Sequence, residues 1–508
     1  MRILSGLNRG FAYVCIICAA AAAFGCDHLP AGQSLWIRLA APVTTYTAKA
    51  GDPVQAVLIQ DLVCDNEVIV PMGATIEGVV RSNRKVGWGI RHETAALELE
   101  FNSATASAGN TVTFTARVEE VENARELVRN GVIQGIRSSD TFQGRINSRL
   151  IHLPTLNPYS DPVLITFKAV FPIFPEPEIY FPSGTDIRLR TTGEISSPNA
   201  TVAAPPNSTE DSLSDSSDNL DMLVEPLPWR VTTTKNVDAD LLNLVFLGSK
   251  DQVNAAFRQA GWQNADPVSR RTVLRNMYAL LNNSGYQREP MRTFLLDGKP
   301  EDMNWQKSLN SYGRRDHLRI WQWKSDEAVG SVNDSAPNPA QNSIQNQVWL
   351  SSSTHDTGAV LAIKYKGFVH HIASDIDDER STVIRELTFA GCVRSVGYVS
   401  RPEVPAATYN ATGDIMHTDG SVAVIALQDC HPIDPQLGSN PQPDTFRPGN
   451  HAFRYIRRQI LTFKNDVWRA NIIYGAFDVG RMTVMAMRHQ YTDQRQRSTM
   501  IVAVNPPS

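Results

Sequence analysis

The 508-residue sequence lacks several features that would place a protein in a functional class directly. It has six cysteines, too few for the disulfide scaffold of a small secreted domain. Lys and Arg number 48 against 52 Asp and Glu, so the formal net charge is only −4 and nothing indicates a nucleic-acid partner. Beyond the N-terminus no apolar run is long enough to span a membrane.

The sequence also lacks the familiar catalytic motifs. It has no Gly-x-Ser-x-Gly elbow, no Walker-type phosphate loop, no Rossmann glycine pattern and no His-Glu-x-x-His pair. What it has is the composition of a globular protein, with 42% hydrophobic and 20% charged residues. Its length predicts two to four domains.

The N-terminus predicts export. Arg2 and Arg9 precede an apolar run from Phe11 to Phe24, the pattern of a secretory signal peptide. The run ends before Cys26 in a sequence similar to the bacterial lipoprotein processing site, although Phe24 departs from that pattern. We therefore expect a signal peptide over 1–25 and a lipidated Cys26. Through the lipid on Cys26 the protein would bind the membrane. We therefore expect it in the cell envelope, anchored on the periplasmic side. Simple secretion and an uncleaved anchor remain alternatives.

Residues 26–195 predict an all-β barrel or sandwich. Polar and apolar residues alternate over 95–101 and 111–118, as in half-buried strands. Apolar residues at helical spacing predict a short helical insertion over 121–128. The acidic Ser- and Pro-rich stretch 196–221 is interpreted as a disordered linker, because it can bury little apolar area.

Residues 222–432 predict an α+β domain, because helical and strand patterns occur there without regular alternation. A helix is expected from about 377 to 390 and a strand over 421–427. Residues 433–508 form a basic extension, with a helix after 451 and a hairpin of strands 482–490 and 499–504. The fold class is therefore multidomain, with the all-β domain first.

The richest set of charged side chains lies between 313 and 380. We identify His355, Asp356, His370 and Asp375 as candidate catalytic residues, with His317, His355 and His371 as candidate metal ligands. Imidazoles and carboxylates bind divalent ions, which activate water for hydrolysis. Arg314, Arg315, His317 and Arg380 are candidates for binding an anionic group. The alternative is that the acidic residues after 374 cap a helix and that the arginines pair with them.

Two cysteines of the α+β domain leave a choice open. In an oxidising compartment Cys392 and Cys430 could form a disulfide, and otherwise they would be two buried thiols.

The charged motifs resemble a known family. The sequences Arg315-Asp-His-Leu-Arg-Ile-Trp321, Thr354-His-Asp356, His370–Arg380, Asn410–Asp414 and Thr418–Gly420 are similar to the LssY-type C-terminal domain, a bacterial envelope domain of unknown function. Upstream, Asn123–Glu126 and Gly131–Gly135 resemble the β-rich region that precedes this domain in lipoprotein-like members. The resemblance implies an envelope lipoprotein, and it implies no activity or cofactor.

Two hypotheses on function follow. The first is a non-catalytic envelope lipoprotein that binds an envelope protein or an anionic ligand through the Arg/His/Asp residues. The second is a metal-dependent hydrolase of phosphate or ester bonds at the same residues.

Overall fold

The computed structural model describes most of the chain in several segments. They comprise residues 28–64, 67–107, 109–137, 141, 163, 166, 175–196, 217–323, 348–362, 367–434, 449, 451–469, 483–484 and 486–487. The predicted signal peptide, the lipidation site Cys26 and residues 197–216 of the predicted linker lie outside them.

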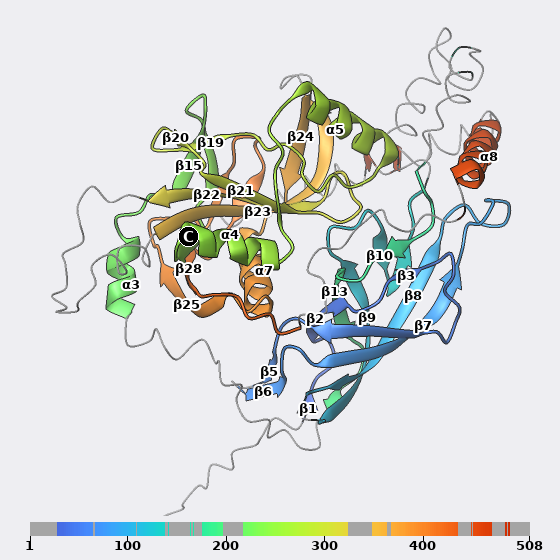
Figure 1. The fold of residues 1–508 in the computed structure, drawn as a ribbon, viewed down its shortest axis with the longest axis horizontal. Coiled ribbons are helices and arrows are strands. Elements are labelled where there is room, and N and C mark those ends of the chain that lie inside the picture. Colours follow the sequence, from blue (N-terminus) through green and yellow to red (C-terminus); the bar gives the residue numbers. More distant parts are fainter. Residues whose placement is uncertain are drawn as a thin grey trace, which may run out of the picture.

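The N-terminal domain is a closed six-stranded β-barrel (Figure 1). Its strands follow the ring order β9-β13-β2-β4-β7-β8, and a pairing between β8 and β9 closes the ring. The bounds are β2 Ser34–Leu39, β4 Pro53–Leu58, β7 Thr75–Arg84, β8 Ala96–Thr105, β9 Thr111–Val121 and β13 Asp186–Thr191. Short strands flank the ring: β1 His28–Leu29, β3 Val43–Thr44, β5 Leu62–Cys64, β6 Glu67–Val70, β10 Leu127–Arg129, β11 Val132–Gln134, β12 Tyr180–Phe181 and β14 Ile195–Ser196.

The alternating sequence pattern explains the barrel. Successive side chains of a strand point to opposite faces, so every second residue faces the interior. In β8, Leu97, Leu99 and Phe101 are fully buried, whereas Glu98 and Glu100 between them are only partly buried. The predicted all-β N-terminal domain is confirmed.

The predicted helical insertion over 121–128 is wrong. Val121 ends β9, Asn123 adopts a left-handed conformation with φ 56°, and Leu127 begins β10. Val121 and Ala124 are buried because this turn packs inward, not because they share a helix face. Asparagine tolerates the left-handed region better than most residues, which allows the sharp turn.

The second domain is built on an eight-stranded mixed sheet. The order is β18-β21-β22-β23-β17-β28-β25, with β24 paired to β23; only β17 and β28 are parallel. The bounds are β17 Leu244–Leu247, β18 Gln263–Asn264, β21 Met303–Lys307, β22 Arg315–Trp323, β23 Val348–Ala362, β24 Gly367–Ile372, β25 Val393–Ser400 and β28 Ser421–Leu427. Smaller sheets contain β15 Arg230–Thr233, β16 Asp238–Leu241, β19 Phe294–Leu296, β20 Lys299–Pro300, β26 Ala407–Tyr409 and β27 Ile415–His417.

Helices accompany this sheet, which makes the domain mixed α/β and the chain multidomain as predicted. They are α3 Ser217–Val224, α4 Lys250–Gln259, α5 Arg270–Asn282 and α7 Ile376–Phe389. Helix α7 buries Val383 and Leu387 against the sheet. Its N-cap Asp375 accepts hydrogen bonds from the backbone N–H groups of Asp377 and Asp378, as the helix-capping alternative predicted.

Two boundary predictions need correction. Residues 217–221 belong to α3 and Ser196 to β14, so these ends of the predicted linker are ordered elements. In the C-terminal extension, the predicted helix is confirmed as α8, His451–Arg469. The described residues within 482–490 are helical, so the first strand of the predicted hairpin is wrong. Its apolar residues suit either structure, because short apolar stretches do not fix a period. The partner stretch 499–504 lies outside the described residues.

No helix in the described segments is long and apolar enough to cross a membrane.

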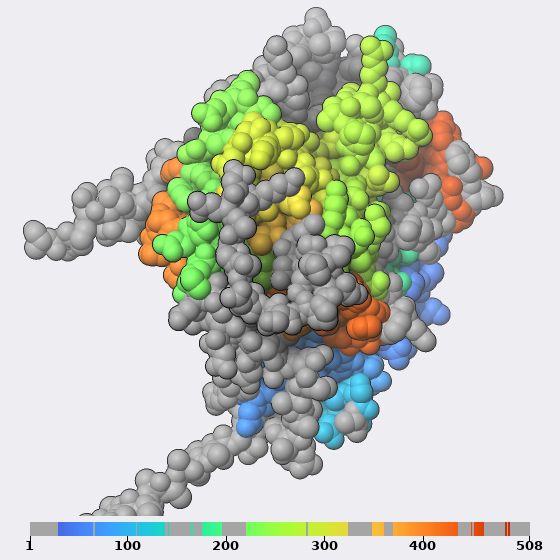
Figure 2. All heavy atoms as spheres, turned by 60° about the vertical axis from the view of Figure 1, so that its left-hand side comes forward, coloured from blue at the N-terminus to red at the C-terminus, as the bar shows by residue number. Residues whose placement is uncertain are grey.

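The barrel and the second domain are packed against each other through α7. In Figure 2, blue residues of the barrel lie in the lower part of the view, with orange residues of the second domain directly above them. Phe389 of α7 packs with Val57 and Ile59 of the barrel. The guanidinium of Arg385 lies 3.8 Å from the ring centroid of Trp36, and that of Arg38 lies 5.1 Å from the ring of Phe389. Such cation–π contacts add to apolar burial at the junction.

Candidate functional site

The pairing of β22 with β23 divides the charged residues between the two faces of the sheet. Asp316 lies opposite His355, and Arg315 lies opposite Asp356. Paired residues share a face and neighbours along a strand alternate. Asp316 and His355 therefore face α7 and the barrel, whereas Arg315 and Asp356 face the other side. The charged residues that the sequence analysis treated as one site therefore form two clusters, one on each face of the sheet.

The first, here called the arginine cluster, centres on Arg315. Its Nε lies 2.8 Å from Asp356 Oδ2, and its Nη1 lies 3.3 Å from a carboxylate oxygen of Glu289. His370 Nδ1 lies 3.2 Å from Asp356, and His370 Nε2 lies 3.2 Å from Glu289. His317 contributes Nδ1 at 3.5 Å from Asp356. All but His370 are more than nine-tenths buried.

Charges within the arginine cluster act on its histidines in opposite directions. Burial lowers the pKa of His317 to about 3, because the attraction of Asp356 is offset by Arg319 and Arg315. Burial also opposes protonation of His370, but the carboxylates of Asp356 and Glu289 raise its pKa to about 9. The cluster therefore holds a protonated His370 between two carboxylates.

We expect this histidine to give the protein a pH-dependent stability. Its pKa of about 9 exceeds the ordinary value of 6.5, so the folded state holds the proton more tightly than the unfolded state. The stabilisation is fully present below pH 6.5 and is lost as the pH rises through about 9. The imidazole of His370 is faced by the charged side chains of Asp356, Glu289 and Arg315 and by the ring of Tyr312.

The loss amounts to about 3 kcal/mol at most, at 1.36 kcal/mol per pKa unit. Urea unfolding of the wild type across this window should show it, and His370→Gln should flatten the profile. His371→Gln serves as the control, because the His371 side chain is half exposed and, among the described residues, bonds Asp414 alone. An unchanged profile in His370→Gln would contradict the assignment.

The second, here called the interface cluster, joins the two domains. Asp316 Oδ1 lies 2.6 Å from His355 Nδ1, and Asn123 Nδ2 of the barrel donates to Asp316 Oδ2 at 2.7 Å. Arg385 Nη2 of α7 lies 3.3 Å from Glu122 Oε1 of the barrel. The cluster comprises Arg38, Glu122, Asn123 and Asp186 of the barrel with Lys307, Asp316, His355, Glu379, Arg385 and Glu386 of the second domain.

Lys307 links the domains most directly. Its Nζ lies 2.7 Å from Asp186 of the barrel and also bonds Glu386 of α7. Asp186 in turn holds Arg38 through two hydrogen bonds of 2.6 and 2.9 Å. All of these side chains are at least nine-tenths buried. Burial works against the charge on Lys307, yet Asp186 and Glu386 raise its pKa above the ordinary value.

The carboxylates of the interface cluster differ in their protonation. Burial, reinforced by the charge of Asp316, raises the pKa of Glu122 and of Glu379 well above the ordinary value. Burial also acts to raise the pKa of Asp316, but hydrogen bonds from His355 and Asn123 lower it overall. Negative charge is therefore concentrated on Asp316, whereas the raised pKa of Glu379 favours its protonated form beside Asp316.

The remaining predicted residues are placed apart from these clusters. Arg380 bonds both carboxylate oxygens of Asp419 at 2.8 and 3.0 Å, and it also reaches Asp377. Asp375 is the α7 N-cap, and His371 bonds Asp414. Among the described residues, the guanidinium of Arg314 alone of the four anion-binding candidates has no hydrogen-bond or ion-pair partner.

The predicted metal trio is not brought together. His317 lies opposite Thr354, the neighbour of His355 along β23, so His317 and His355 are on opposite faces of the sheet. His371 is on β24 beside Asp414. The sequence did not indicate Glu122, Lys307 or Glu386 as members of a site. It indicated Glu379 only as part of the acidic start of a helix. The seven-residue spacing of Glu379 and Glu386 was a usable indication, because residues two turns apart share a helix face.

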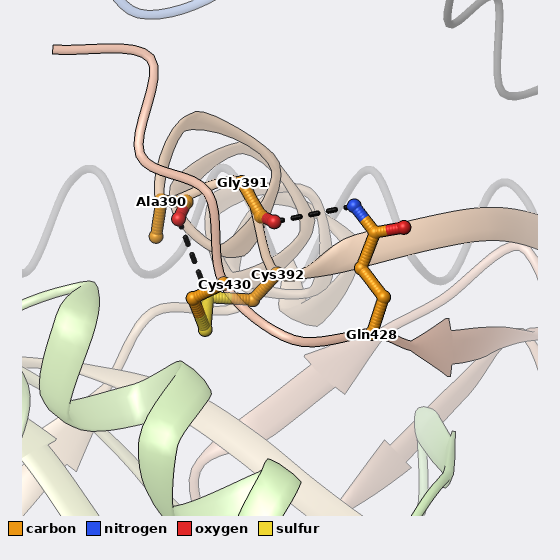
Figure 3. Close-up of a disulfide and its surroundings, with 5 residues drawn as sticks. All are labelled: Ala390, Gly391, Cys392, Gln428 and Cys430. Atoms are coloured by element: carbon orange, nitrogen blue, oxygen red, sulfur yellow. Dashed lines mark hydrogen bonds between the residues drawn. A yellow bond between two sulfur atoms is a disulfide. The ribbon is translucent and has the colours of Figure 1, made fainter.

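A disulfide joins Cys392 and Cys430, immediately after α7 and β28 (Figure 3). Beside it, the Gln428 side-chain amide donates to the carbonyl of Gly391 at 3.2 Å. Gly391 has φ 69°, and a Cβ there would lie 1.8 Å from the carbonyl oxygen of His431. Only glycine fits this close approach, which ends α7 and brings the two cysteines together.

One of three comparisons with known proteins bears on the second domain. Comparison with curated proteins finds no match. A solved structure described as ComB10 of the Com type IV secretion system of Helicobacter pylori is 12% identical, with a TM-score of 0.20. The match covers 34% of this chain and 92% of that chain, and a likeness this weak supports no statement on function. The family model described as "LssY C-terminus" matches residues 224–422. The second domain of this chain therefore is an LssY-type C-terminal domain.

Proposed function

We propose that this chain is an exported bacterial cell-envelope lipoprotein that acts as a non-catalytic binding protein. In this proposal the LssY-type domain is fixed to the barrel, and the two domains together present one surface to an envelope protein. The charged residues that characterise the domain maintain that arrangement and perform no chemistry.

The observation that carries the proposal is the internal pairing of the charged residues. Arg315 and Arg380 each bond carboxylates of this chain, and His317 bonds Thr354 Oγ1 at 3.0 Å. These three side chains are buried, and each is already bonded to a group of this chain, although His317 Nδ1 and Arg380 Nε have no hydrogen-bond partner among the described residues. Their internal pairing favours a structural role over capture of an anion. Arg314 is the member of the set that remains available to a partner.

Export is supported by two independent features. The N-terminus has the order of a secretory signal, and Cys392 and Cys430 are joined by a disulfide. Disulfides persist in oxidising compartments and are rare in the bacterial cytosol.

Lipidation is tested by metabolic labelling with an alkyne fatty acid in a bacterial host. We expect label on the wild type, none on Cys26→Ser, and unchanged label on Cys18→Ser, a control within the apolar run. Absence of label from the wild type, or label retained by Cys26→Ser, would contradict the lipoprotein assignment.

Partner binding is tested by photo-crosslinking in the same cells. A crosslinking residue at Arg314 should give a discrete adduct with an envelope protein, and one at the exposed Arg129 of β10 should not. Equal adducts from both positions would indicate nonspecific contact.

The metal-dependent hydrolase is the second candidate, and one observation favours it. Asp316, His355 and Glu379 offer ligand atoms that all lie within 4.8 Å of one another. Only His355 reaches solvent, with 23% of its side chain exposed. A substrate could not contact the carboxylates without separating the domains. We therefore expect phosphoester and ester turnover with added Zn²⁺ or Mn²⁺ to be the same in the wild type and in Glu379→Gln.

A further inference from the structure

The three side chains Asp316, His355 and Glu379 meet where β22, β23 and the first turn of α7 come together. One ligand atom of each lies within 4.8 Å of the other two, a spacing that a single ion can span. We propose that they bind one divalent metal ion, and that this ion helps to fix the LssY-type domain to the barrel. This goes beyond the proposed function, which requires no metal.

An unpartnered buried oxygen points to a ligand at this position. Glu379 is 3% exposed, and its Oε1 has no hydrogen-bond partner. An unsatisfied buried carboxylate is costly, so native structures rarely leave one without a proton, a cation or a water. The Oε2 atom of the adjoining Glu122 is likewise buried and without a hydrogen-bond partner.

The distribution of cations singles out this corner of the interface cluster. Both oxygens of Glu386 are occupied, one by Lys307 and the other by the Trp262 indole N–H. Lys307 and Arg38 also hold Asp186. The direct ion pairs of these two cations are therefore with Asp186 and Glu386, not with Asp316 or Glu379. Among the described residues, His355 is the one cationic side chain in contact with Asp316, and none forms an ion pair with Glu379. A bound cation would balance the charge that remains at this corner.

Asp316 retains coordination capacity although its carboxylate is already hydrogen-bonded to His355, Asn123 and Glu379. An ionised carboxylate offers about four lone-pair positions, of which His355 and Asn123 use two and the neighbouring Glu379 carboxyl a third, so one remains. The bond from Asn123 orients the carboxylate from the barrel side, as outer-shell partners do in metal sites. Because Asn123 belongs to the barrel, occupancy by metal would strengthen the contact between the domains.

The donor set indicates the class of metal. One imidazole with two carboxylates suits a first-row divalent ion, and among the common ones Zn²⁺ binds more tightly than Mn²⁺. Mg²⁺ prefers oxygen donors and retains its waters, so a buried site with an imidazole fits it poorly. His355 provides the solvent-facing side through which the ion would enter.

The test is metal content and thermal stability of the full chain. The protein is stripped with chelator, dialysed, repleted with Zn²⁺ alone and analysed by elemental mass spectrometry. We expect about one equivalent retained after removal of excess metal. We also expect a thermal midpoint several degrees higher than in the stripped protein. Glu379→Gln and His355→Ala should lose the metal and the rise in midpoint.

The control is Glu289→Gln. Glu289 is also 3% exposed and lies beside a histidine, but it belongs to the arginine cluster on the other face of the sheet. It should retain the metal. A repleted wild type with no bound zinc would overturn the proposal, as would zinc retained equally by Glu379→Gln and His355→Ala. If either variant fails to fold, the zinc content and midpoint of the wild type decide alone.

Discussion

Replacing Lys307 with methionine is expected to lower the free energy of unfolding by about 3–5 kcal/mol, the usual cost of removing one partner from a buried ion pair. The side chain is 6% exposed and lies between Asp186 of the barrel and Glu386 of α7. Methionine matches its length but leaves both carboxylates buried without their shared cation. The loss is therefore in the contact between the domains rather than in packing volume.

Urea unfolding of the full chain, followed by tryptophan fluorescence and far-UV circular dichroism, measures the effect. Lys299→Met is the matched control, because Lys299 is exposed on β20 and no ion pair involves it among the described residues. It should change stability by less than about 0.5 kcal/mol. Equal effects of the two substitutions would show that Lys307 contributes no more than a surface lysine.

Replacing Arg315 with methionine is expected to lower the free energy of unfolding by a similar amount, about 3–5 kcal/mol. Its guanidinium lies between Asp356 and Glu289, alone among the arginines that the structure describes, and it also donates to Gln306 Oε1 at 2.7 Å. Without it, His370 is left as the nearest cation for two buried carboxylates. The variant should therefore be less stable than the wild type by a margin that grows as His370 loses its proton above pH 9.

The adjacent Arg314 supplies the control for this substitution. Arg314→Met changes the same residue type one position away, where the guanidinium is half-buried and unpaired among the described residues. It should leave stability nearly unchanged. A loss of stability in Arg314→Met as large as in Arg315→Met would contradict the arginine cluster as the source of the effect.

The elements with a clear period could be predicted from sequence. The strands of the barrel alternate polar and apolar residues, as Leu97, Leu99 and Phe101 do, and the helix ending at Gly391 has both an acidic start and a glycine stop. The helix predicted over residues 121–128 was wrong because the spacing of the buried Val121 and Ala124 matches a helical period. Their burial comes from tertiary packing, which a local pattern does not contain.

The candidate site was predicted in composition but not in geometry. His317, His355 and His370 all lie in charged clusters, but the pairing register of β22 and β23 puts His355 on one face and His317 on the other. His370 of β24 lies with His317, because both contact Asp356. The alternation of faces along each strand could have been predicted once the strands were known. The register between the strands could not be predicted, and neither could the contact of Asn123 with Asp316, which are separated by 193 residues.

The central claim is that buried charge pairs fix the LssY-type domain to the barrel, and a double-mutant cycle across the boundary tests it most directly. The cycle combines Lys307→Met with Asp186→Asn and measures the free energy of unfolding of all four proteins. We expect a coupling energy of about 1.5 kcal/mol or more between the two sites. Additive losses, with a coupling within about 0.5 kcal/mol of zero, would show that the pair does not join the domains.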